Sequence, residues 1–95
     1  MPQHNWTYED DIVAYYLCRY GLESLLFDLN NISKKLGMPA ASMKMRAKNF
    51  KALETLDNGS NGGLTNYAKL SKKVFEQYKN VQKPEHLKEV KKILY

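Results

Sequence analysis

The chain has 95 residues, with 15 Lys or Arg against 10 Asp or Glu, so its formal net charge at pH 7 is +5. That length accommodates one domain with a single modest hydrophobic core. The only cysteine, Cys18, excludes an internal disulfide and fits a reducing compartment, and no apolar stretch approaches the roughly 20 residues that span a bilayer. We therefore expect a soluble, cytoplasmic protein without a membrane partner.

The first predicted helix begins after Trp6. Thr7 suits the N-cap position, Asp10 completes a weak form of the capping box three residues later, and Gly21 is placed to end the helix. At helical spacing one face is apolar and is expected to be core: Ile12, Val13, Tyr16, Leu17 and Tyr20. The opposite side is less polar than a free surface usually is, and it should meet either the C-terminal segment or a partner chain: Ala14, Tyr15 and Cys18.

Two helices around a tight turn are predicted next, which is the pattern of a helix-turn-helix. The second helix starts near Asp28 or Asn30 and closes at Gly37, and the third runs from Pro39 to about Leu53. Residues 22–27, before them, form either a further helical turn or an irregular link. The expected buried positions of the second and third helices are apolar: Leu29, Ile32 and Leu36, then Met43, Ala47 and Phe50.

Positive charge is concentrated in this helix-turn-helix segment. Between Leu29 and Leu53 there are six Lys or Arg and no Asp or Glu, so a polyanion is the partner that the segment favours. The competing interpretation is that these lysines form an ordinary solvated face.

The expected contact residues follow from the buried stripe, because positions about 180° away around the third helix project outward. Lysines there can neutralise phosphates or reach guanine, alanines allow close approach to the major groove, and Asn49 can pair with adenine. The predicted nucleic-acid-binding residues are Lys34, Lys35, Ala41, Ser42, Lys44, Met45, Lys48, Asn49 and Lys51. Arg46 lies near the edge of the buried stripe, and we expect it to pair with Glu9 on the inward face of the first helix or with a neighbouring acid.

The second half of the chain begins with a loop at residues 54–65 that is rich in Gly and Asn. A fourth helix is expected from about Asn66 to Lys79, and a last, lysine-rich helix starts at Pro84. The apolar positions of the fourth helix are Tyr67, Leu70, Val74, Phe75 and Tyr78. The last helix carries a narrow apolar stripe that either closes the core or holds a dimer partner: Leu87, Val90 and Leu94.

The sequence carries no catalytic or metal-binding pattern. His4 and His86 are far apart, and one cysteine with two scattered histidines lacks the spacing of a metal site. Cys18 is expected to be an inert thiol, and the glycines match neither a P-loop nor a dinucleotide fingerprint. We expect a non-enzyme without metal or cofactor.

The opening Trp6-Thr7-Tyr8-Glu9-Asp10-Asp11, together with Phe50 late in the third helix, resembles Myb/SANT-like tri-helical DNA-binding domains. The segment from Gly37 to Phe50 and the later Gly62–Asn66 turn are also similar to small helical domains that accompany some bacterial HNH-type nucleases. This resemblance implies DNA binding by the third helix. A Myb repeat has three spaced core tryptophans whereas this chain has one, and no HNH signature is present, so no cleavage activity is implied.

The sequence thus predicts one all-α domain over residues 1–95, with a tri-helical helix-turn-helix core at 6–53 and one or two additional helices within 66–95. Our first hypothesis is a small bacterial or phage regulator or accessory module. It would bind double-stranded DNA, specifically or generally, through the third helix, and anchor itself through Lys34, Lys35 and the C-terminal lysines, with a homodimer as one option. The alternative is a protein-interaction module, an inhibitor or adaptor, that uses the first helix or the basic C-terminal helices.

Overall fold

The computed structural model describes residues 6–22, 25, 27–57 and 69–95. This part of the chain contains five α-helices and no strand, which confirms the all-α prediction. The helices are α1 (Tyr8–Tyr20), α2 (Leu29–Leu36), α3 (Ala40–Asp57), α4 (Lys69–Tyr78) and α5 (Lys83–Leu94).

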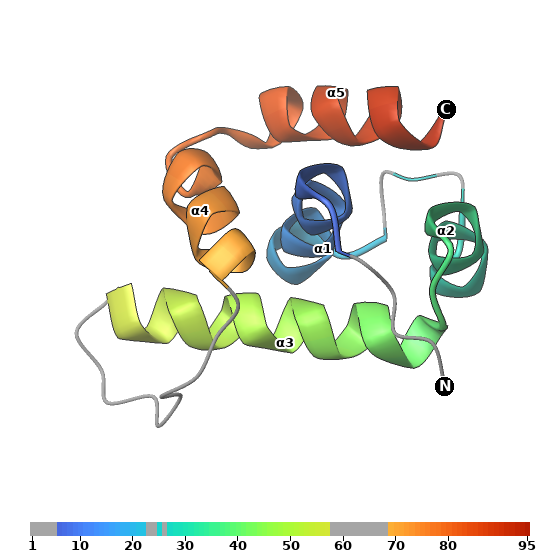
Figure 1. The fold of residues 1–95 in the computed structure, drawn as a ribbon. Helices are drawn as coiled ribbons and strands as arrows, with labels where there is room; N and C mark the ends of the chain where they lie inside the picture. The colour runs from blue at the N-terminus through green and yellow to red at the C-terminus, as the bar shows by residue number, and fades with distance from the viewer. Residues whose placement is uncertain (1–5, 23–24, 26, 58–68) are drawn as a thin grey trace.

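Helix α1 lies at the centre of the molecule, with α3 on one side of it, α5 on the opposite side and α4 across one end of the gap between them (Figure 1). Ala14 and Tyr15 are as deeply buried as Val13 and Tyr16. The less polar side of α1 therefore meets the C-terminal segment, one of its two predicted options. The Tyr15 ring stacks on Phe50 of α3 with centroids 4.9 Å apart and lies 5.5 Å from Phe75 of α4.

The hydrophobic core is shared among the five helices. Val74 and Phe75 of α4, and Val90 and Leu94 of α5, belong to the same buried cluster as Ile32 of α2. The apolar stripe of α5 is thus used inside the chain. Helix α1 makes its main contacts with α3, α4 and α5, whereas α2 packs on α3. A separate tri-helical core stays a prediction, because α4 and α5 contribute to the core around α1 as α3 does.

The start of α1 has the predicted capping box. The Thr7 side chain accepts a hydrogen bond from the Asp10 amide at 3.2 Å, and the Asp10 carboxylate accepts one from the Thr7 amide at 3.1 Å. Both groups satisfy amides that the first helical turn leaves without intrahelical partners. Gly21 ends the helix at φ +74°.

Helix α2 and the turn that joins it to α3 are fixed by three local features. Asp28 caps α2 by accepting from the Asn31 amide at 2.8 Å, and Gly37 ends the helix in the left-handed region at φ +83°. The Met38 amide then bonds back to the Ser33 carbonyl at 2.9 Å, as in a Schellman motif, and the Met38 side chain is buried. Met38 is a poor helix cap, yet it anchors the turn through its burial.

Three details of the predicted helices are corrected. Helix α3 continues past Leu53 to Asp57, and Leu53 is buried while Ala47 is only half-buried. Leu29 and Leu36 are likewise half-buried, because α2 covers only one end of α3. Residues 54–57 of the predicted loop belong to α3, whereas the rest of that loop and the predicted start of the fourth helix at Asn66 lie outside the described residues.

Candidate nucleic-acid interface

Helix α3 has an inner and an outer side. Helices α1 and α4 pack on its inner side, where Met43 and Phe50 are fully buried, and in Figure 1 no described helix lies below α3. We call the outward residues Ala41, Lys44, Met45 and Lys48 the α3 face. All four are exposed, and Met45 exposes 70% of its surface. A single exposed apolar side chain is ordinary on a protein surface, so the two lysines give the α3 face its character.

The structure places the other predicted contact residues around the α3 face. Lys34, Lys35 and Lys51 are exposed, and Ser42 and Asn49 are partly exposed. Lys35 stands over the Phe27 ring, with its Nζ 4.6 Å from the centroid. Lys51 lies on the flank towards α1, since its charge acts on Cys18. The predicted set is thus exposed, wholly or in part, on two consecutive helices.

The lysines of the α3 face carry uncompensated charge. No carboxylate within the described residues forms an ion pair with Lys44 or Lys48. This follows from the sequence, since residues 29–53 contain no acid that could serve as a helical neighbour. The face is therefore positive and available to an anionic partner.

Arg46 does not belong to this surface. Its Nε and Nη2 donate to the two oxygens of Asp11 at 2.6 and 2.8 Å, and its guanidinium stacks on Trp6 with the Cζ atom 4.4 Å from the ring. The Asp11 side chain has no exposed surface, and the Ser71 hydroxyl lies 3.4 Å from both of its oxygens. The predicted pairing with a neighbouring acid is confirmed, whereas the expected inward position of Glu9 is wrong, because Glu9 is exposed.

This buried pair positions the α3 face. Asp11 belongs to α1, Arg46 to α3 and Ser71 to α4, so one carboxylate joins three helices. A bidentate contact between a guanidinium and a carboxylate fixes orientation as well as distance. Arg46 therefore sets the rotation of α3, and this rotation keeps Lys44 and Lys48 outward.

A second buried polar group, His86, was not anticipated. Its Nε2 donates to the Ile12 carbonyl at 2.9 Å, and its Nδ1 lies 3.3 Å from Nη1 of Arg19, which also donates to the Tyr78 carbonyl at 2.8 Å. The pKa of His86 is lowered to about 4, mainly by burial; the hydrogen bond to Ile12 acts to raise it, and the nearby Arg19 charge acts to lower it. The sequence feature that indicates the burial of His86 is its spacing, since His86 precedes the buried Val90 by four residues and lies on the same helix face.

Cys18, the one thiol of the chain, lies half-buried on α1. Burial, followed by the charge of Glu54, raises the pKa of Cys18 to about 11, so the thiol is protonated at neutral pH. The Sγ atom of Cys18 lies 3.9 Å from a Glu54 oxygen. Among the residues that the structure covers, no three His, Cys, Asp or Glu side chains come together in a way that could hold a metal ion.

Comparisons of the chain with protein-family models, with curated proteins and with solved structures find no match. Within the described ranges, no helix has the length and apolarity needed to cross a membrane. The function of the chain is therefore inferred from the α3 face itself.

Proposed function

We propose that this protein binds double-stranded DNA through the α3 face, as a regulator or an accessory DNA-binding module. The observation that carries the proposal is a solvent-facing helix surface, centred on the exposed Met45, whose lysines form no ion pair with any acid in the part of the chain that the structure describes. Lysines of such a helix neutralise phosphates, and small or apolar side chains between them allow the backbone to approach base edges. Lys34, Lys35 and Lys51 extend the same charge to both sides of α3.

The geometry restricts which lysines take part. Helix α5 lies on the far side of α1 from α3 (Figure 1), so its lysines would not reach a duplex that is seated on the α3 face. The expected anchoring by C-terminal lysines is therefore dropped for α5. Arg46 is also excluded from contact with DNA, since its donors are directed to Asp11.

The alternative function, a protein-interaction module that uses the first helix, receives no support from burial. The Tyr15 side chain is 2% exposed, and Cys18 is half-buried beside Glu54. A partner could not contact the aromatic side of α1 without displacing α4 and α5.

The proposal is tested by fluorescence anisotropy with a labelled random-sequence duplex over a series of salt concentrations. Contacts to about four to six phosphates give a slope of log K against log [salt] near −4 to −5. A Lys44→Ala/Lys48→Ala/Lys51→Ala variant should lose most of the affinity and flatten the slope by about 2 to 3.

The matched control removes the same charge from the other side of the molecule. A Lys88→Ala/Lys91→Ala/Lys92→Ala variant changes three exposed lysines of α5, so net charge falls equally while the α3 face is intact. Affinity should then fall only through the weak long-range field. Equal losses in the two variants, or no binding by the native chain at low salt, would refute the proposal.

A further inference from the structure

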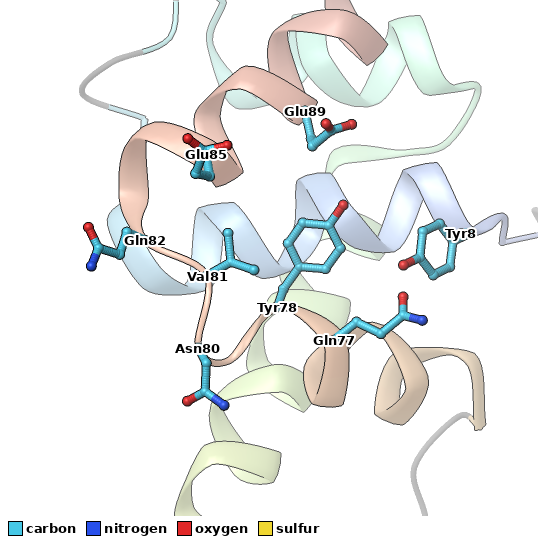
Figure 2. Close-up of a pocket in the computed structure, with 8 residues that line it drawn as sticks. All are labelled: Tyr8, Gln77, Tyr78, Asn80, Val81, Gln82, Glu85 and Glu89. Atoms are coloured by element: carbon cyan, nitrogen blue, oxygen red, sulfur yellow. The ribbon is translucent and has the colours of Figure 1, made fainter.

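A cleft opens where the first turn of α1, the end of α4 and the start of α5 meet (Figure 2). We call it the α4–α5 cleft; its volume is about 570 Å³, and its principal lining residues are Tyr8, Gln77, Tyr78, Glu85 and Glu89. Tyr78 stands in the middle of the view in Figure 2, with the Tyr8 hydroxyl directed towards it and Glu89 above. The cleft is thus a concave site whose walls come from three helices.

The lining of this cleft is acidic, although the chain as a whole is basic. The chain contains 15 Lys or Arg, yet none of the residues that line the cleft is basic, and two of them are glutamates. Glu85 and Glu89 are four residues apart on α5, so they are neighbours on one helix face with Cβ atoms about 5–6 Å apart. Two carboxylates therefore border one cavity, whose other lining residues are two tyrosines, one valine and three side-chain amides.

The acceptors of the α4–α5 cleft are largely unused by the protein. Within the described residues, Glu85 has no ion-pair partner, and the hydroxyls of Tyr8 and Tyr78 have no hydrogen-bond partner. Glu89 meets Lys92 at 3.5 Å, but both side chains are well exposed, and such pairs hold their partners weakly. These groups are consequently available to a ligand.

The charge of Glu89 acts on both phenols of the cleft. Burial raises the pKa of Tyr8, and the charge of Glu89 raises it further. The pKa of Tyr78 is raised in the same way, first by burial and then by the proximity of Tyr8 and Glu89. Both phenols are therefore neutral at pH 7. Their ring faces and oxygens are available to a ligand in the cleft.

We propose that the α4–α5 cleft binds an aliphatic diammonium or polyammonium ion, a small molecule with primary amines joined by short methylene chains. Each ammonium group would bind a carboxylate of Glu85 or Glu89 and donate to the phenol oxygens and the Gln77 amide oxygen. Methylene groups next to a cation pack favourably on the faces of tyrosine rings. Anions are repelled by the same two carboxylates. This site is independent of DNA binding by the α3 face.

The test is a calorimetric titration of the full chain with 1,4-diaminobutane and with spermidine at low ionic strength. We expect saturable binding of one ligand per chain. A Glu85→Gln/Glu89→Gln variant should bind about tenfold more weakly, because two exposed ion pairs are lost. Both substitutions are conservative and lie on exposed or half-buried positions, so circular dichroism should show the native helix content.

Two controls separate the site from general attraction of cations. Glu76→Gln removes an exposed carboxylate of α4 outside the lining of the cleft and should leave binding unchanged. 1,4-Butanediol, which has the same chain without charge, should not bind. The proposal is overturned if the diamine and spermidine show no saturable binding up to about 10 mM. It is also overturned if the double variant binds like the native chain, or if Glu76→Gln weakens binding as much as the double variant does.

Discussion

The Asp11–Arg46 pair should control the stability of the whole domain, and its removal is the sharpest test of the fold described above. Asp11→Asn keeps the volume of the side chain but leaves the Arg46 guanidinium, 12% exposed, without its countercharge. Arg46→Met leaves the Asp11 carboxylate in a site with no exposure. Breaking a buried pair in this way costs about 3–5 kcal/mol, far more than the 0–1 kcal/mol that is typical of an exposed pair.

The expected loss of stability is large for a chain of this size. About 5 °C of melting temperature is lost per kcal/mol in a domain of this length, so each single variant should melt roughly 15–25 °C below the native chain. Urea unfolding followed by circular dichroism measures the free energy of unfolding directly. A double variant, Asp11→Asn/Arg46→Met, removes both charges, and it should be more stable than the sum of the single losses predicts by about 2 kcal/mol.

Control variants for the Asp11–Arg46 pair are chosen by the burial and contacts of the residues that they change. Glu9→Gln removes an exposed acid two residues from Asp11 and should change the free energy of unfolding by less than about 0.5 kcal/mol. Ser71→Ala, which loses only long contacts of 3.4 Å to the carboxylate, should cost about 1 kcal/mol or less. Losses below about 1 kcal/mol for both single variants of the pair, or strict additivity in the double variant, would show that the pair does not hold α3 and α4 on α1.

Two further predictions concern stability. The pKa of His86 is about 4 in the fold against 6.5 in its ordinary state, so the unfolded chain takes up a proton at a higher pH than the folded chain does. The free energy of unfolding should therefore be at its full value above pH 6.5 and fall by about 3 kcal/mol as the pH drops to 4. Urea titrations at each pH should give a shallower decline for His86→Gln, and an unchanged decline would contradict this origin. Gly37→Ala should lower the free energy of unfolding, measured with urea, by about 1 kcal/mol, because φ at Gly37 is +83° even though an added Cβ would meet nothing within 4 Å. Gly37→Asn should lower it less, since asparagine tolerates the left-handed region better. Native-like stability of Gly37→Ala would contradict the conformational argument.

Local signals in the sequence were sufficient for several elements. The capping box at Thr7, the helix end at Gly37 and the start of the last helix near Pro84 depend on hydrogen bonds or backbone angles within a few residues, so the sequence predicts them directly. The outward position of Lys44 and Lys48 was also predictable, because it follows from the 100° rotation per residue once Met43 and Phe50 are taken as buried.

Packing between distant segments decided the rest. Three features depend on helices separated by tens of residues, so no local rule indicates them. They are the enclosure of α1 on its Tyr15 side, the pairing of Arg46 with Asp11 rather than Glu9, and the contact between His86 and Arg19. The α4–α5 cleft has the same origin, since its walls come from the start of α1 and the far end of the chain.

The sequence by itself determined a basic, all-helical chain with an acid-free basic segment on two consecutive helices, since helical periodicity and capping are local properties. The tertiary structure decided which acid takes up Arg46. It buries Arg46 against Asp11 while leaving Lys44 and Lys48 exposed, because an arginine at the edge of the apolar stripe can satisfy its charge on a central helix and the outward lysines cannot reach one.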